Sequence, residues 1–400
     1  MDDRCDLILH VGLPKGGSSA LQTALSMTPD LTSASGRQLR YTALRQRGGL
    51  TSIRYGEDLS RDARRSPYGY VSWPNMKAGD AASPVFEALG KVMAAGWEGG
   101  FVPIASCEGW VSRPNIFAKQ LQMWGNPRVE VVAFLRPPLD WVNAAYWQWG
   151  IWHQPDLDLW LKRGNLPYEF GPVLERWSTI PNLRLRLGNA RPDVVAKFSE
   201  FYGVDLPNAL SSNTSSPPAL IGFLLRNRQF RSSGHDASTE FIFQRWCPPV
   251  EGRKPWAIRA RHVWQLRPMV QRNRAALRRI ANEAELADIF SDARWTDESR
   301  YHAALRAGVS ALDDRTEMAG LRESLLEGLH RACAAVGCPM PAVPDCPREG
   351  ASTQEWDDMF CPLMEALLRA DLAVREAQGG RELRGLKARM MRSFPKLFGG

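Results

Sequence analysis

Over its first half, the chain alternates between short apolar runs and segments with helical spacing. The runs Leu7–Val11, Phe101–Ser106 and Val129–Leu135 have the length and composition of strands, and residues 183–187 alternate leucine with arginine. Helical spacing follows in residues 18–25, 85–95, 115–124, 139–146 and 194–201. Strands that alternate with helices predict an α/β fold, a mostly parallel sheet covered by helices on both faces.

The pattern changes outside these segments. Residues 29–85 are rich in Arg, Ser, Gly and Pro, and we predict loops with short elements there. Beyond residue 215, helical periodicity covers residues 257–290, 303–335 and 355–378, with a linker at Pro339–Pro347 and a basic tail at Lys387–Lys396. We expect an α/β core in residues 1–215, a helical part completing that domain in 216–338, and a linker with a helical tail in 339–400.

A glycine-rich loop follows the first predicted strand. It reads Gly-Leu-Pro-Lys-Gly-Gly-Ser-Ser from Gly12 to Ser19, and helical spacing begins directly after it. Such a loop points backbone N–H groups at one spot beside the positive end of a helix. Lys15 adds a charge, and Ser18 and Ser19 add hydroxyl donors. The loop therefore predicts a site for a phosphate or sulfate group, although an ordinary strand-to-helix turn is the simpler alternative.

The loop departs from the Walker pattern of nucleotide triphosphatases, because Ser18 stands where the Walker lysine belongs. The order of Pro14, Lys15, Gly16, Gly17, Ser18 and Ser19 instead resembles the 5′-phosphosulfate loop of sulfotransferases. That family transfers a sulfuryl group from 3′-phosphoadenosine 5′-phosphosulfate (PAPS) to a hydroxyl. The resemblance implies a P-loop-like three-layer fold, PAPS as co-substrate, and donor contacts from these six residues.

A second motif begins with Arg136, directly after the run Val129–Leu135. It resembles the sulfotransferase motif for the 3′-phosphate, in which an arginine ends a strand and a serine follows eight residues later. Ala144 occupies the serine position and offers no hydroxyl. Asn143 could substitute, although it points about 100° around the helix. Looser matches to bacterial carbohydrate-type members lie in residues 186–215.

The acceptor hydroxyl must lose a proton during transfer, and family members use His or a carboxylate near the second strand. Glu108 follows that strand and is the first candidate base. Its alternative role is a solvated carboxylate that caps the next segment or pairs with Lys15 or Arg136. His10, inside the first strand, is the second candidate, although a strand histidine is more often a core residue.

The amino-acid composition indicates which classes of ligand the protein can bind. The 400 residues carry a formal charge of +8, mainly from arginine, which favours anionic ligands. We find no basic runs interleaved with aromatics, so nucleic acid is not expected.

No segment approaches a membrane-spanning length, no signal peptide is evident, and we expect a cytoplasmic protein. The seven cysteines, four of them Cys333, Cys338, Cys346 and Cys361, match no zinc spacing, and no metal site is expected.

The resemblance thus implies a PAPS-dependent sulfotransferase, and we expect its acceptor to be a hydroxyl of a carbohydrate or glycolipid. Trp141, Trp147, Trp149, Trp152 and Trp160 gather near Tyr146; most of them are expected to pack in the core, and one or two could line the acceptor cleft. Two rivals remain open. One is a P-loop kinase, and the other is a catalytically silent relative that only binds a nucleotide or a glycan.

Overall fold

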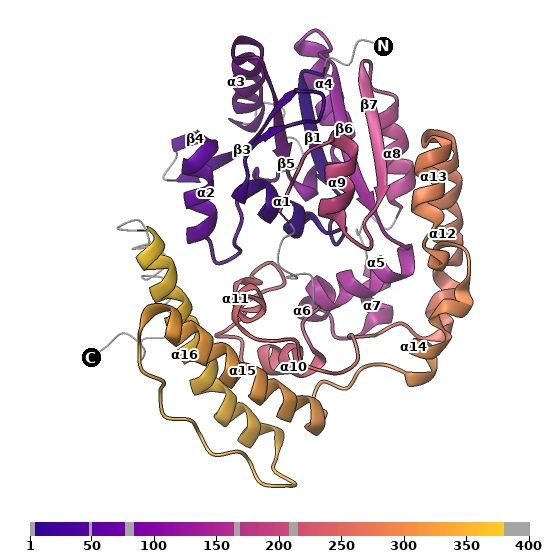
Figure 1. The fold of residues 1–400 in the computed structure, drawn as a ribbon. Helices are drawn as coiled ribbons and strands as arrows, with labels where there is room; N and C mark the ends of the chain where they lie inside the picture. The colour runs from indigo at the N-terminus through magenta and orange to yellow at the C-terminus, as the bar shows by residue number, and fades with distance from the viewer. Residues whose placement is uncertain (1–4, 48–49, 77–83, 164–168, 208–214, 380–400) are drawn as a thin grey trace.

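The computed structural model describes residues 5–47, 50–76, 84–163, 169–207 and 215–379. Its centre is a mixed, mostly parallel seven-stranded sheet (Figure 1) with the strand order β2-β3-β5-β1-β6-β7, and β4 pairs with β3. The strands are β1 Leu7–Gly12, β2 Asp30–Thr32, β3 Gln38–Arg47, β4 Leu50–Arg54, β5 Phe101–Ser106, β6 Val129–Leu135 and β7 Leu183–Asn189.

Strands β3, β5, β1, β6 and β7 run parallel, while β2 and β4 pair antiparallel with β3. The parallel strands therefore end at one edge of the sheet, called here the carboxyl edge, and begin at the opposite amino edge. The predicted strands at Phe101–Ser106 and Val129–Leu135 are confirmed with the expected bounds. The α/β fold class with a mostly parallel sheet is likewise confirmed.

Helices cover both faces of the sheet. One face buries α1 (Ser18–Met27), α2 (Gly56–Arg65) and α9 (Val194–Tyr202) in a core with Ile8, Val132 and Phe134. The other face carries α3 (Pro84–Gly99), α4 (Pro114–Met123) and α8 (Phe170–Ser178). Helix α9 ends at Gly203, which adopts φ +58°, as expected for a glycine after a helix.

The prediction for residues 29–85 is wrong in part, because β3 is a ten-residue strand inside the sheet. Leu39, Tyr41 and Ala43 are buried on one side of it, so the two-residue period was present. The polar residues between them obscured that period. One of them is Arg40, whose guanidinium lies 4.3 Å from the ring centre of Phe101. The Arg40 side chain therefore packs on an aromatic ring instead of extending fully into solvent.

The second half of the chain is helical, as predicted, and forms its own apolar core together with the segment after β6. That segment contains α5 (Pro138–Ala145), η2 (Tyr146–Gly150), α6 (Ile151–His153) and α7 (Leu157–Arg163). The later helices are α10 Pro218–Arg226, α11 Ser238–Trp246, α12 Ala260–Ile280, α13 Glu283–Phe290, α14 His302–Ala307, α15 Arg315–Val336 and α16 Thr353–Gly379. Three short 3₁₀ segments are η1 Glu108–Ser112, η3 Ala293–Trp295 and η4 Glu298–Tyr301.

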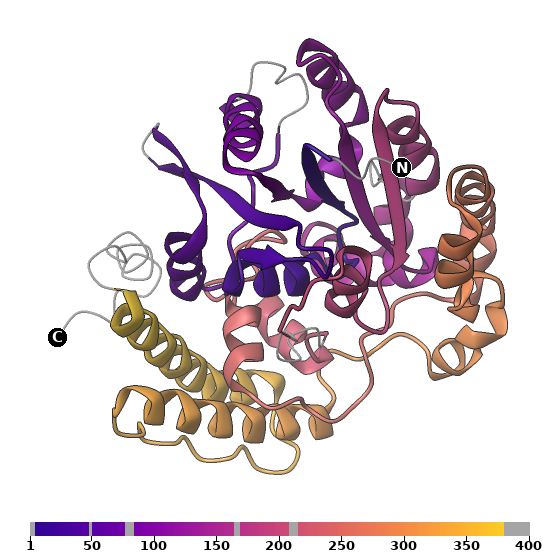
Figure 2. The ribbon, with the colours of Figure 1, turned by 45° about the horizontal axis from the view of Figure 1, so that its top comes forward.

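The helical pattern over residues 257–290 is divided between α12 and α13, because Asn282 caps the second helix. Helix α12 packs on α8, and α13 packs on β7. Helices α15 and α16 lie side by side (Figure 2), joined by the predicted linker without helix or strand. The expected basic tail at Lys387–Lys396 lies outside the described residues.

The helical part lies against the carboxyl edge of the sheet. Figure 1 places α5, α6 and α11 beneath the ends of the parallel strands, on the side where α1 begins. Trp141, Trp147, Trp152 and Trp160 are buried in this helical core, and Trp149 is half-buried against it. The expectation that most of these tryptophans pack in the core is confirmed.

Candidate functional site

The glycine-rich loop lies at the carboxyl edge, between β1 and α1, so the predicted order of strand, loop and helix is confirmed. Gly16 lies so close to β6 that a Cβ atom there would lie 2.5 Å from the carbonyl oxygen of Phe134. Gly17 adopts φ +86° and is the N-cap of α1, with no side-chain cap. The first N–H groups of a helix have no acceptor within it, so Gly17 leaves those of Ser18 and Ser19 open to an anion.

Lys15 is held in the loop by contacts at both ends of the residue. Its backbone adopts φ +61°, a left-handed conformation uncommon for a residue with a side chain. Its carbonyl oxygen accepts a hydrogen bond from Arg136 Nη1 at 3.1 Å, and its Nζ donates to Gln148 Oε1 at 3.2 Å. Burial, followed by the charge of Arg136, lowers the pKa of Lys15, while Glu108 opposes that shift.

Two other loop contacts fix its path. The indole Nε1 of Trp141 donates to the carbonyl oxygen of Pro14 at 2.7 Å. The Ser18 hydroxyl donates to the carbonyl oxygen of Leu13 at 3.2 Å, so its proton serves the loop rather than a ligand. Ser19 is half-buried at the first turn of α1. The Ser19 hydroxyl contacts the hydroxyl of Tyr70. The anion donors that the loop presents are therefore backbone N–H groups and the ammonium of Lys15.

Glu108 begins η1, directly beyond β5 and next to the end of β1. Its backbone approaches the loop so closely that a Cβ on Gly12 would lie 2.9 Å from the Glu108 carbonyl oxygen. Burial raises the pKa of the Glu108 carboxyl, and the charge of Lys15 partly offsets this rise. A carboxylate whose pKa is raised is a stronger base than an ordinary glutamate.

Tyr70 borders the same site and was not among the residues predicted from the sequence. Burial, followed by the charge of Glu108, raises the pKa of Tyr70 well above its usual value, so its hydroxyl stays protonated. No local signal marked this residue, because it lies in the segment predicted as loops.

His10 lies inside the sheet and is fully buried. Its Nδ1 is 2.7 Å from the Ser106 hydroxyl, which also accepts a hydrogen bond from Gln22 Nε2 at 3.0 Å. Burial lowers the pKa of His10 to about 4, so the imidazole is neutral at physiological pH. This is the environment of a core histidine, whereas Glu108 is only half-buried.

Arg136 follows β6 at the carboxyl edge and joins a cluster with Arg191 and Arg294, called here the arginine cluster. Asp140 lies among them, 2.9 Å from Arg294, 3.5 Å from Arg191 and 3.8 Å from Arg136. Burial, followed by repulsion from Arg191, lowers the pKa of Arg136 to about 10. Among the described residues, the buried Nε of Arg136 has no hydrogen-bond partner. The cluster therefore contains one buried donor that the described residues do not satisfy.

Sequence analysis predicted only Arg136 of these three. Arg191 follows the end of β7, so its place at the carboxyl edge was open to inference from the strand pattern. Arg294 belongs to η3, more than a hundred residues away, and reaches the cluster because Trp295 is buried beside α8. No local pattern predicts that approach.

The side-chain amide of Asn143 is already hydrogen-bonded to the protein backbone at both ends. Its Nδ2 donates to the carbonyl oxygen of Pro255 at 2.8 Å, and its Oδ1 accepts from the N–H of Ala257 at 2.9 Å. Both ends of the amide thus hold the segment before α12. A phosphate contact from Asn143 would require the loss of these bonds, so the substitution for the missing serine stays a prediction without support from this geometry.

Residues of the helical part support Gln148, the residue that contacts Lys15. Arg231, fully buried, is paired with Glu240 and donates to the carbonyl oxygen of Gln148 at 2.7 Å. Burial raises the pKa of Glu240, and the charge of Arg231 opposes this shift. The ion pair thus fixes the backbone of η2 at Gln148, whose side-chain amide contacts Lys15.

Comparisons with family models, with curated proteins and with solved structures found no significant match for this chain. Within the described part of the chain, no helix is both long and apolar enough to cross a membrane. The same residues contain no group of three or more His, Cys, Asp or Glu side chains placed to hold a metal ion.

Proposed function

We propose that this protein transfers a sulfuryl group from PAPS to a hydroxyl of a carbohydrate or glycolipid. The observation that carries the proposal is the direct link between two anion sites: Arg136 donates to the carbonyl oxygen of Lys15 at 3.1 Å. The loop would bind the phosphosulfate, and the arginine cluster would bind the 3′-phosphate. The P-loop-like character of the fold belongs to the same proposal.

The residues support an in-line transfer. The acceptor oxygen attacks sulfur, the bond between sulfur and the bridging phosphate oxygen breaks, and 3′-phosphoadenosine 5′-phosphate leaves with the electron pair. Lys15 and the N–H groups of α1 stabilise the charge on the transferring group and the leaving oxygen. Glu108 takes the acceptor proton as the oxygen–sulfur bond forms. Trp149, half-buried beside the helical core, is the favoured aromatic contact for a sugar ring.

A thermal-shift titration tests the donor. At a hundredfold excess over its dissociation constant, 3′-phosphoadenosine 5′-phosphate should stabilise the fold by about 2.7 kcal/mol. ATP with Mg²⁺, the ligand of the kinase alternative, should stabilise less. A clear advantage of ATP with Mg²⁺ would contradict the proposal. A screen with labelled PAPS against sugars and lipids would then identify the acceptor.

A catalytically silent donor-binding protein is the second candidate, favoured by Ala144 and by the engaged amide of Asn143. Introducing the hydroxyl by Ala144→Ser should tighten binding of the bisphosphate several-fold if the motif is aligned correctly. Tight donor binding without turnover on any tested hydroxyl would favour the silent candidate over the sulfotransferase.

A further inference from the structure

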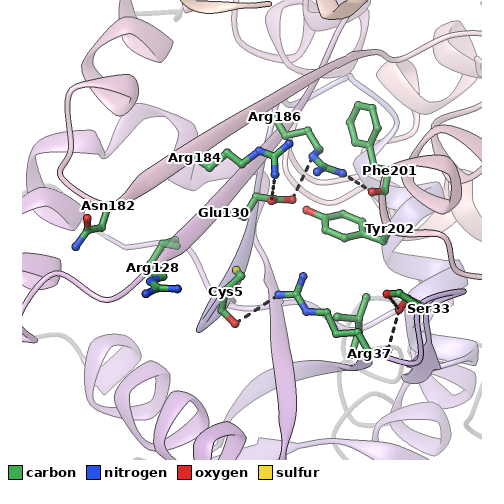
Figure 3. A pocket seen from close by; sticks show the side chains of 13 residues that line it. Cys5, Ser33, Arg37, Arg128, Glu130, Asn182, Arg184, Arg186, Phe201 and Tyr202 are labelled. Atoms are coloured by element: carbon green, nitrogen blue, oxygen red, sulfur yellow. Dashed lines mark hydrogen bonds and ion pairs between the residues drawn. The ribbon is translucent and has the colours of Figure 1, made fainter. Parts of the chain in front are cut away.

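A second cationic hollow lies at the amino edge of the sheet, opposite the loop site. It encloses about 260 Å³. Figure 3 shows its lining, which contains four arginines, Arg37, Arg128, Arg184 and Arg186, and one carboxylate, Glu130, toward which Arg184 and Arg186 point. Arg37 precedes β3, Arg128 precedes β6, and the other two lie on β7. Because these strands run parallel, the four arginines meet at the edge where the strands begin.

Part of this charge is already compensated. Glu130 and Arg184 face each other in the register of β6 and β7, with Nη1 and Oε2 3.8 Å apart. Arg186 Nε lies 3.3 Å from Glu130 Oε1, and its guanidinium packs over the rings of Phe201 and Tyr202. Arg37 donates to the carbonyl oxygen of Cys5, which carries no charge. One carboxylate cannot neutralise the guanidinium groups of Arg37, Arg184 and Arg186, so the lining keeps an excess of positive charge.

The hollow also contains the hydroxyl of Tyr202. Tyr202 is 8% exposed, and its hydroxyl lies near the Glu130 carboxylate but, among the described residues, makes no hydrogen bond of ordinary geometry. Figure 3 shows this hydroxyl inside the hollow, on the side of Glu130. Burial, followed by the charge of Glu130, raises the pKa of Tyr202, so the hydroxyl keeps its proton. A buried polar group of this kind is costly unless a ligand or water satisfies it.

We propose that this hollow binds the phosphate or sulfate group of a small molecule. Guanidinium groups bind such tetrahedral anions with paired hydrogen bonds, and the Tyr202 hydroxyl supplies a further donor. The volume lies below the range of about 300–1,000 Å³ typical of sites for drug-sized ligands, which favours a small ester or a free anion over a nucleotide. This inference does not rest on the proposed sulfotransfer.

Calorimetric titration of the full-length protein with inorganic phosphate tests the site, in a buffer whose ionic strength is held constant with chloride. Sulfate, glycerol 3-phosphate and glycerol are titrated in parallel. The anions should bind saturably and glycerol should not. Glycerol 3-phosphate binding tighter than inorganic phosphate assigns the site to small esters, and the reverse order assigns it to the free anion.

Variants locate the binding. The double variant Arg37→Gln with Arg184→Gln should weaken phosphate binding at least about tenfold, because two charge-assisted contacts are lost. Tyr202→Phe, which removes only the hydroxyl, should weaken it about two- to tenfold. The matched control Arg272→Gln removes an exposed arginine of α12 and should leave binding unchanged. Because the glycine-rich loop is itself a predicted anion site, the binding that belongs to the hollow is the part that remains in Lys15→Ala and is weakened in the double variant.

The inference would be overturned by three results. Phosphate binding that is lost in Lys15→Ala and kept in the double variant would assign the anion to the glycine-rich loop. Equal binding by all variants would show attraction to net charge alone. Failure of the protein to bind any of the three anions saturably would remove the site altogether.

Discussion

The two edges of the same sheet both present positive charge, but they present it with different groups. At the carboxyl edge, backbone N–H groups at the start of α1 converge with Lys15, and Glu108 lies beside them with a raised pKa. At the amino edge, the hollow offers arginine side chains and one tyrosine hydroxyl as donors, and Glu130, the one carboxylate among the residues that line it, is held by two arginines. One edge therefore combines an anion site with a base, while the other offers binding alone.

This difference follows from how parallel strands meet helices. A helix that begins after a strand points its N-terminal N–H groups at the carboxyl edge, where they supply rigid donors at no cost in side-chain entropy. Among the described residues, no helix begins at the hollow, so its positive charge comes from long arginine side chains. Arg186 is already held by Glu130 and two rings, whereas Arg184 is largely exposed and would lose side-chain entropy on binding a ligand. We therefore expect chemistry at the first edge and weaker, salt-sensitive binding at the second.

The largest expected effect separates the base from a mere charge partner. Glu108→Gln keeps the shape of the side chain but cannot accept a proton, so kcat should fall by about 10²–10⁴ with donor affinity almost unchanged. Steady-state kinetics with labelled PAPS and calorimetry with the bisphosphate give both quantities. Glu98→Gln, an exposed change on α3, is the control. Near-normal turnover would place the base elsewhere, with His10 the next residue to test.

Lys15→Ala should remove charge stabilisation in the transition state and lower kcat by about 10²–10³. Lys91→Ala, which removes an exposed lysine of α3, should leave kcat unchanged. Single-turnover measurements keep the chemical step separate from product release. A loss confined to KM would mean that Lys15 binds ground state and transition state equally, and the proposed role in transfer would be wrong.

Arg136→Ala should weaken binding of 3′-phosphoadenosine 5′-phosphate by about 10- to 100-fold, since a contact to a charged phosphate is worth about 1.5–3 kcal/mol. Because Arg136 also holds the carbonyl oxygen of Lys15, a smaller loss in kcat should accompany it. Arg184→Ala at the amino edge should leave donor affinity unchanged. Equal losses of donor affinity in Arg136→Ala and Arg184→Ala would mean that the carboxyl edge is not the specific donor site.

The pH profile gives the smallest effect, about tenfold in rate per pH unit on the acid side. A base must be ionised, so kcat/KM should be full above the pKa of Glu108 and fall as the pH drops through it. Because burial raises that pKa, the acid limb should lie above the ordinary glutamate value of about 4.3. Lys15 lowers the pKa of Glu108, so Lys15→Ala should move the limb to higher pH. A limb that does not move would mean that the two charges are not coupled.

Local sequence patterns were sufficient for the parts of the site that lie at the ends of strands. The runs that became β1, β5 and β6 fixed the positions of Lys15, Glu108 and Arg136, because parallel strands end at one edge. They were not sufficient for β3, whose buried Leu39 and Tyr41 alternate with arginine and other polar residues. A two-residue hydrophobic period reveals a strand only where the residues between the buried positions face solvent. In β3 these residues also pack against neighbouring side chains.

The sequence by itself determined the α/β class, the loop between β1 and α1, and the strand ends that carry the candidate chemistry, because each depends on residues adjacent in the chain. Only the tertiary structure decided that Arg294 joins Arg136, that Arg231 and Glu240 hold Gln148 over Lys15, and that Asn143 is engaged by the segment before α12. Packing between helices and pairing between strands bring such distant residues together, and no local pattern encodes those contacts. The amino-edge hollow has the same origin, since its four arginines come from three separate strands or strand starts.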